Sequence, residues 1–236
     1  MCEELTTNAE LPERTVHFDD KNDDLEIMWL QEKFHGFANI GVTTLPGCRY
    51  KEQERNLVKD VEKIVQQKVT DVFCLVTTSE MQKFRVKHLL QMYQKYSLRV
   101  HHHPCEDGGL FPVPELIAII DKLYHIIEDE GNPLLHCVAG KGRSCLVLAA
   151  YLIAWHRPPL SSMKAIETVQ MFRMCSAFSV KQYNFLVDFP AVLNEYRKNT
   201  LSQMVTSPSQ GQETCNDDPI QSELPSQSES TNKEYL

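Results

Sequence analysis

The sequence predicts an α/β fold, in which a central, mostly parallel twisted sheet is flanked by helices. Two short apolar runs, 72–76 and 134–136, have the length and composition of buried strands, and 98–103 is a third strand candidate. Longer segments lie between them, and in these the apolar residues recur every three or four positions, as on one face of a helix. Strands that alternate with helices usually pair in parallel, because each helix carries the chain back across the sheet.

The first half of the expected domain starts with an amphipathic helix over 52–68. The strand at 72–76, with the sequence VFCLV, follows it. Ser79 and Gln82 have the spacing of a capping box, so we expect a second helix to begin there, with an apolar face that continues to Met92.

The second half continues the alternation. After the strand at 98–103, Pro112 and Pro114 begin a helix that Gly131 ends. The strand at 134–136 comes next. Three further helices are expected, at 145–155, near 161–173 and at 180–198.

Composition divides the 236 residues into three parts. Residues 1–24 hold eight acidic side chains against two basic ones and little apolar periodicity, so we expect a flexible acidic arm. Residues 200–236 hold eleven Ser or Thr, three Pro and one aromatic residue, and such a segment buries too little surface to offset the entropy of ordering. We therefore expect a folded domain at 25–199 and a disordered, Ser/Thr-rich acidic tail.

The net charge of −8 argues against a general nucleic-acid-binding protein, which needs a basic surface. The arm contributes −6 and the tail −5, so the block 25–199 carries +3. A mildly basic domain attracts anionic ligands. The acidic excess lies in the flanking segments, so our expectation of no nucleic-acid partner depends mainly on the cysteine motif described below.

The cysteines and the apolar runs indicate in which cellular compartment the protein is expected. The eight cysteines are scattered without a C-x-x-C pair, which favours neither a zinc site nor a disulfide scaffold. The first residues contain no apolar signal segment, and the longest apolar run, 146–155, is about half of the roughly 20 residues that span a bilayer. We expect reduced thiols, no membrane span and a location in the cytoplasm or nucleus, the perinuclear region included.

One motif carries most of the functional information: His136-Cys137, five further residues, then Arg143-Ser144. A glycine-containing loop that leads into a helix directs its backbone N–H groups inward and forms a cradle for an anion. The helix dipole and the Arg143 cation favour the thiolate form of Cys137. The planar guanidinium of Arg143 can also hold two phosphoryl oxygens. The pattern therefore predicts a thiolate nucleophile in a phosphate site.

The neighbours of Cys137 have supporting roles in this prediction. The Ser144 hydroxyl can hydrogen-bond the Cys137 sulfur when the sulfur leaves, and His136 is expected to tune the nucleophile through buried hydrogen bonds rather than to act as a base. The loop between nucleophile and arginine is expected to bind phosphate, and its residues are Val138, Ala139, Gly140, Lys141 and Gly142. No metal or organic cofactor is needed.

A thiolate attack also needs an acid that protonates the departing oxygen. Asp107 follows the strand candidate 98–103, and the ends of parallel strands bring it to the same sheet edge as Cys137. Glu106 is the second candidate. A purely structural Asp at the Gly108-Gly109 bend is the alternative.

Two other features stay open. In a strand, His101, His102 and His103 point alternately to opposite faces, which disfavours a metal site, and we expect His102 or His103 to support the acid segment. Gln182 is a candidate for positioning the hydrolytic water. However, Ser179 and Gln182 also have the spacing of a capping box.

These motifs resemble those of the cysteine-dependent protein tyrosine phosphatase superfamily, in its dual-specificity branch. Within that branch the chain is similar to the cyclin-dependent-kinase-associated phosphatases. The resemblance covers about residues 40–195, and these segments carry it: Leu45-Pro46-Gly47-Cys48, His101-His102-His103-Pro104, Asp107-Gly108-Gly109, residues 136–147 and Lys181-Gln182-Tyr183-Asn184.

The resemblance implies a dual-specificity phosphatase-like fold, a phosphocysteine intermediate and Asp107 as general acid. It implies hydrolysis of phosphothreonine or phosphoserine and of phosphotyrosine, with a phosphothreonine on the activation segment of a cyclin-dependent kinase as the substrate and thus a role in the cell cycle. The partner is then a phosphorylated protein, and we expect the enzyme to be a monomer.

Lys141 departs from this pattern, because the kinase-associated phosphatases have an apolar residue there and phosphoinositide phosphatases carry Lys. A phosphoinositide phosphatase is therefore one alternative. A catalytically silent, kinase-binding scaffold is the other, and the joint presence of Cys137, Arg143 and Asp107 argues against it.

Overall fold

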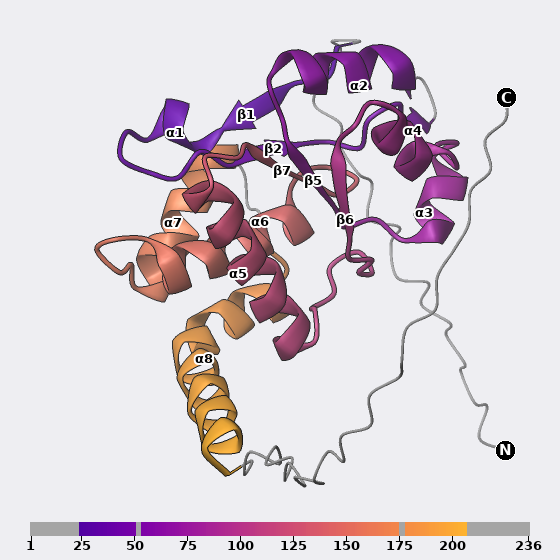
Figure 1. The fold of residues 1–236 in the computed structure, drawn as a ribbon. Helices are drawn as coiled ribbons and strands as arrows, with labels where there is room; N and C mark the ends of the chain where they lie inside the picture. The colour runs from indigo at the N-terminus through magenta and orange to yellow at the C-terminus, as the bar shows by residue number, and fades with distance from the viewer. Residues whose placement is uncertain (1–23, 51–52, 175–177, 207–236) are drawn as a thin grey trace, which may run out of the picture.

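The structure is a computed structural model, and it describes residues 24–50, 53–174 and 178–206. At its centre lies a five-stranded sheet with the order β1-β2-β7-β5-β6 (Figure 1). β1 pairs antiparallel with β2 at one edge, and the other three pairs of neighbours are parallel. The predicted mostly parallel α/β sheet is therefore confirmed. Its strands are β1 (Ile27–Trp29), β2 (Gly41–Thr43), β7 (Pro133–His136), β5 (Asp71–Cys74) and β6 (Arg99–His102).

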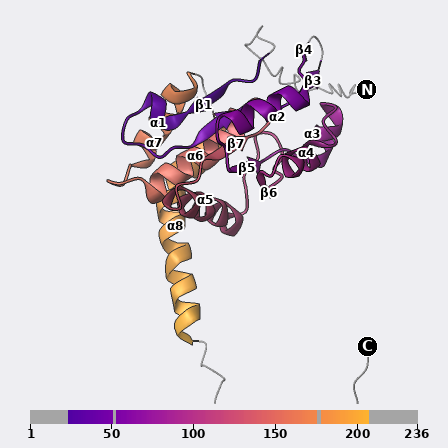
Figure 2. The same ribbon diagram turned by 45° about the horizontal axis from the view of Figure 1, so that its top comes forward.

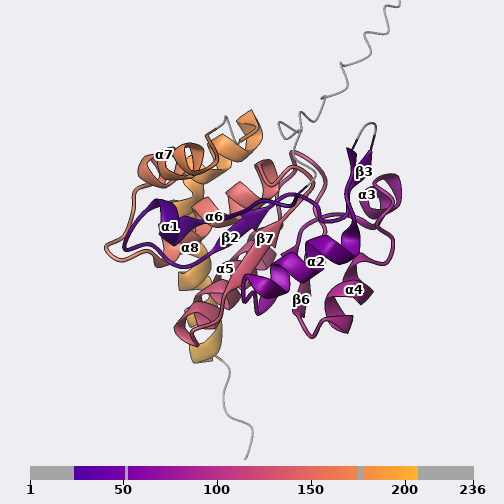
Figure 3. The ribbon, with the colours of Figure 1, turned by 90° about the horizontal axis from the view of Figure 1, so that it is seen from above.

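Helices cover both faces of this sheet (Figures 1 and 3). One face packs in an apolar cluster with α5 (Val113–Glu128), α6 (Gly142–Trp155), α7 (Ser162–Arg173) and the first half of α8 (Val180–Thr206). The other face packs with α2 (Leu57–Gln66), α3 (Thr78–Lys83) and α4 (Leu89–Lys95). A short helix α1 (Leu30–Lys33) and a small hairpin of β3 (Arg49–Tyr50) and β4 (Gln53–Glu54) complete the described elements.

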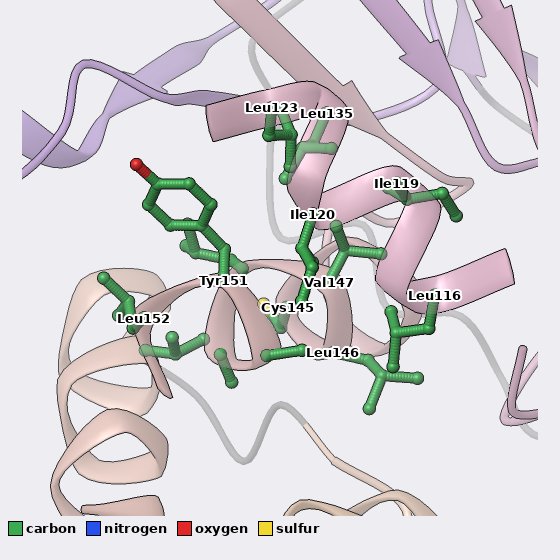
Figure 4. Close-up of a cluster of buried hydrophobic side chains, with 14 of the residues drawn as sticks. Leu116, Ile119, Ile120, Leu123, Leu135, Cys145, Leu146, Val147, Tyr151 and Leu152 are labelled. Atoms are coloured by element: carbon green, nitrogen blue, oxygen red, sulfur yellow. The ribbon is translucent and has the colours of Figure 1, made fainter. Parts of the chain in front are cut away.

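The central helix α6 is buried on all sides. Every residue from Arg143 to Ala154 is shielded from solvent, and the side chain of Val147 points toward Ile120 of α5 (Figure 4). A helix surrounded in this way has little freedom to shift, because neighbouring side chains fill the space on each side. The N-terminus of α6, which carries the last residues of the cysteine motif, is therefore held in place by the core.

Several predicted boundaries differ from the structure. The predicted helix 52–68 begins only at Leu57, because residues 53–54 form β4 and Asn56 caps the helix with its side chain. The helix predicted at 145–155 begins at Gly142. The last helix continues to Thr206 and does not end at 198, so residues 200–206 of the expected tail are helical (Figure 2). The arm at 1–23 and the tail from 207 lie outside the described residues.

The capping box predicted at Ser79 and Gln82 is wrong. The cap is Thr77, whose Oγ1 accepts from the N–H of Glu80 while its own N–H donates to Glu80 Oε2. The helix also ends early, because Arg85 adopts a left-handed φ of 61° and the N–H of Val86 turns back to Met81 O. The predicted helix up to Met92 is thus two helices, α3 and α4.

Asp71, the first residue of β5, is a buried carboxylate held by neighbouring donors. Arg99 donates to both carboxylate oxygens, at 2.9 and 2.6 Å, and the His101 ring and the Thr70 hydroxyl contact it at 2.8 and 2.7 Å. Burial alone would raise the pKa of Asp71, but these hydrogen bonds outweigh burial and lower the pKa from 3.8 to about 2. A carboxylate with a lowered pKa stabilises the fold only while it is ionised.

We expect Asp71→Asn to lower the free energy of unfolding by about 2 kcal/mol near neutral pH. The contribution of Asp71 is complete above about pH 4 and is lost as the pH falls towards 2, so the difference between variant and wild type should shrink over that range. Urea unfolding at several pH values measures it. Asp188→Asn, a change of an exposed carboxylate on α8, is the control and should cost less than about 0.5 kcal/mol.

Candidate active site

The middle of the cysteine motif forms a loop, residues 137–141, between the end of β7 and the start of α6. Gly140 has a φ of 61°, and a Cβ on it would lie 2.5 Å from the carbonyl oxygen of Thr43, so the loop packs directly against the end of β2. The N–H of Leu45 also donates to Val138 O at 2.9 Å. The loop is therefore held between β7, which leads into it, and the end of β2. Cys137 lies at the first position of the loop and is 3% exposed.

Arg143, in the first turn of α6, is fully buried. Its Nη1 and Nη2 donate to the two carboxylate oxygens of Glu80 at 2.6 and 2.7 Å, and Nη1 also donates to the carbonyl oxygen of Cys105 at 2.7 Å. Burial alone would lower the pKa of Arg143, but the hydrogen bonds to Glu80 outweigh burial and hold the pKa above its ordinary value. The guanidinium is a permanent cation with a fixed orientation.

Two buried donors in the first turn of α6 have no partner among the described residues, namely Arg143 Nε and the Ser144 hydroxyl. Besides Glu80, the Asp107 carboxylate approaches Arg143 Nη2, at 3.7 Å. Nε and Nη2 are the pair of donors on one edge of the guanidinium that can hold two oxygens of a phosphoryl group. Unsatisfied buried donors at a helix N-terminus fit an anion site.

Asp107 is brought to this site, as predicted. It lies in a turn of residues 106–109, hereafter the acid turn, which the N–H of Gly109 closes by donating to Glu106 O at 2.9 Å. Gly108 has a φ of 70°, which the third residue of a type II turn requires. The Asp107 side chain is 59% exposed and lies over the buried guanidinium. Glu106 is exposed, and its carboxylate forms no ion pair with the described residues.

His136 precedes the nucleophile and is fully buried. Its Nε2 lies 3.0 Å from the hydroxyl of Tyr93, and burial lowers its pKa from 6.5 to about 3. A ring with that pKa is neutral near pH 7 and does not serve as a proton donor there. This environment agrees with a tuning role, which stays a prediction, as does the Ser144 contact to the departing sulfur.

The three histidines have separate partners. His101 contacts Asp71, His102 Nε2 lies 2.9 Å from the carbonyl oxygen of Val76, and His103 Nδ1 lies 3.2 Å from Glu115 Oε1. The described residues contain no group of three or more metal-ligating side chains suited to hold a metal ion. The contact of His103 links the end of β6 to the start of α5, and so ties together both ends of the segment that carries Asp107.

Gln182 lies 0% exposed at the start of α8, and the capping box with Ser179 is confirmed. Its amide nitrogen donates to the carbonyl oxygen of Gly109 at 2.9 Å. Both polar groups of the side chain are therefore engaged by protein.

Sequence reasoning missed Glu80 and Tyr93. Glu80 is 63 residues from Arg143 and Tyr93 is 43 residues from His136, so no local pattern joins them. The spacing Thr77-x-x-Glu80 was the available signal for the cap, and Ser79-x-x-Gln82 concealed it.

Comparison with known proteins agrees with this geometry. The family model of cyclin-dependent kinase inhibitor 3 matches residues 9–166. The cyclin-dependent kinase inhibitor 3 of Rattus norvegicus is 35% identical over 80% of this chain and 90% of its own length, and that of Homo sapiens is 34% identical over 72% and 81%.

A solved structure of kinase associated phosphatase, with its catalytic-site cysteine substituted by serine, is 32% identical and has a TM-score of 0.69. The match covers 74% of this chain and 98% of that one. Several further matches are to protein tyrosine phosphatases. The chain is thus a cysteine-dependent protein phosphatase of the dual-specificity type, and it belongs to the cyclin-dependent kinase inhibitor 3 family.

Proposed function

We propose that the protein removes the phosphate from phosphothreonine or phosphoserine and from phosphotyrosine on the activation segment of a cyclin-dependent kinase. The observation that supports the reaction is the buried Arg143 guanidinium, which is anchored by Glu80 and lies 3.7 Å from Asp107, while its Nε has no partner in the described part of the chain. The names of the relatives, kinase inhibitor and kinase associated phosphatase, support a kinase substrate.

The mechanism has two steps. In the first, the Cys137 thiolate attacks phosphorus, so that a sulfur–phosphorus bond forms while the bond to the leaving oxygen breaks. Arg143 and the N–H groups of the loop stabilise the equatorial oxygens, and Asp107 gives its proton to the leaving oxygen. In the second step, water attacks the phosphocysteine with Asp107 as the base. Phosphate departs and the thiolate is restored without a cofactor.

The remaining expectations belong to this proposal. The enzyme acts as a monomer in the cytoplasm or nucleus, with a phosphorylated protein and no nucleic acid as partner. Among the described helices, none is both long enough and apolar enough to cross a membrane. Val138, Ala139, Gly140, Lys141 and Gly142 bind the phosphoryl oxygens through their backbone.

Phosphate release tests the substrate class. Wild-type protein is offered a phosphothreonine-bearing kinase, a peptide of its activation segment and a soluble short-chain phosphoinositide, side by side. We expect kcat/KM to be at least about tenfold higher for the kinase than for the phosphoinositide. A faster reaction with the phosphoinositide would overturn the substrate and favour the alternative that Lys141 suggests, whereas kinase binding without any turnover would favour the scaffold.

A further inference from the structure

The first turn of α8 holds the backbone of the acid turn. Ser179 Oγ donates to the carbonyl oxygen of Gly108 at 3.3 Å, and Gln182 Nε2 donates to the carbonyl oxygen of Gly109 at 2.9 Å. These carbonyls belong to the two residues that follow Asp107. The side chains of Ser179, which directly precedes α8, and of Gln182 thus hold the turn directly behind the candidate acid.

The capping box fixes the direction in which Gln182 donates. Ser179 N–H donates to Gln182 Oε1 at 3.1 Å, and Gln182 N–H donates to Ser179 Oγ at 3.2 Å. Because Oε1 faces a donor, the amino group of the side chain must face the Gly109 carbonyl, and the amide cannot be flipped without losing both bonds. The side chain is fully buried and each of its polar atoms already has a protein partner, so Gln182 is poorly placed to orient a hydrolytic water.

The acid turn needs such support. Asp107 is 59% exposed, and the ion pair to Arg143 spans 3.7 Å, longer than a hydrogen bond. The turn closes on itself through one bond, from Gly109 N–H to Glu106 O. The place of the carboxyl group is therefore set mainly by the backbone of the turn, and α8 sets that backbone.

We propose that Gln182, together with Ser179, is a positioning residue that holds the acid turn so that Asp107 reaches the leaving oxygen in the first step. This rests on the proposed function, in which Asp107 is the general acid. It replaces the water-positioning role that the sequence left open for Gln182. The start of α8 would then serve the first chemical step and not the second.

Gln182→Glu separates this role from helix capping. A glutamate keeps an oxygen that accepts from Ser179 N–H and adds a charge that suits a helix N-terminus, but the ionised carboxylate cannot donate to Gly109 O. We expect kcat/KM for a phosphothreonine peptide, whose leaving group needs protonation, to fall by about 10- to 100-fold. With nitrophenyl phosphate, whose leaving group does not, kcat/KM should stay within about threefold.

Two more variants distinguish the proposed positioning role from an effect of lowered stability. Gln182→Met has a similar shape without hydrogen bonds and should show the same split between the two substrates. Ser161→Ala removes the N-cap of α7, whose Oγ accepts from Lys164 N–H, and no described hydrogen bond joins Ser161 to the acid turn. Ser161→Ala should lower the free energy of unfolding by about as much as Gln182→Met does, and it should leave both kcat/KM values unchanged.

The parameter kcat/KM reports only the steps up to formation of the phosphocysteine. It is therefore sensitive to protonation of the leaving group by Asp107 and not to hydrolysis of the intermediate. Equal losses on both substrates, or a loss in kcat with kcat/KM unchanged as for a water-positioning residue, would overturn the proposal. Different measurements would show that the proposed function itself is wrong. Its failure would appear as an Asp107→Asn variant without any preference for the activated leaving group, or as wild-type protein without turnover.

Discussion

Cys137→Ser is expected to lower kcat for every phosphomonoester on the order of 10⁴-fold or more, while phosphate binding survives. A serine hydroxyl stays protonated near neutral pH and is a far weaker nucleophile than cysteine sulfur. The substitution leaves the binding groups in place, because Arg143 is anchored by Glu80 and not by the sulfur. Steady-state kinetics with nitrophenyl phosphate and phosphate inhibition constants measure both effects.

Cys48→Ser is the matched control. Cys48 is fully buried, and burial raises the pKa of its thiol to about 11, so this cysteine is uncharged. The same change of sulfur to oxygen there should cost about 1–2 kcal/mol of stability and leave kcat within about twofold. Comparable losses of kcat in the two variants would mean that Cys137 acts through the fold and not as the nucleophile.

Because it still binds phosphate, the Cys137→Ser variant should also retain its substrate. Affinity capture from cells that contain phosphorylated kinases is expected to hold a phosphothreonine-bearing kinase, and free phosphate or vanadate should release it. A variant that also carries Arg143→Lys should lose this capture, because an ammonium group cannot reproduce the planar pair of donors.

The loop was predictable because its parts are adjacent in the chain. A buried strand, a glycine-containing turn and an apolar helix follow one another, and this order alone places Cys137 beside Arg143 at a helix N-terminus. The apolar runs likewise revealed β5 and β7, which lie in the middle of the sheet.

The parts that escaped prediction depend on distant partners. The strands β1 and β2 have three residues each, too few for an alternating pattern to appear, and β2 joins the sheet by pairing with the distant β7. Glu80 looks like any residue near a helix start until the fold brings it to Arg143. The spacing of Ser179 and Gln182 indicates the capping box, but the second hydrogen bond of Gln182 joins segments 73 residues apart.

The second large effect is expected for Asp107→Asn. An amide cannot give a proton to the leaving oxygen, so kcat/KM for a phosphothreonine peptide should fall by about 10²- to 10⁴-fold. Nitrophenol is a good leaving group that departs without protonation, so kcat/KM for nitrophenyl phosphate should change by less than about fivefold. Asn is well tolerated in turns, and the Gly109-to-Glu106 bond that closes the acid turn involves no side chain, so the fold should persist.

A series of phosphomonoesters with leaving groups of increasing basicity tests this assignment more stringently than two substrates do. In wild-type protein the logarithm of kcat/KM should depend weakly on that basicity, because Asp107 neutralises the charge that develops on the leaving oxygen, whereas in Asp107→Asn the dependence should be steep. Glu106→Gln, which changes the exposed neighbour that forms no ion pair with the described residues, should keep the weak dependence of wild type. If Glu106→Gln steepens the dependence and Asp107→Asn does not, the two carboxylates exchange roles. If neither does, the proton comes from outside the acid turn, and the 3.7 Å approach of Asp107 to Arg143 is then purely electrostatic.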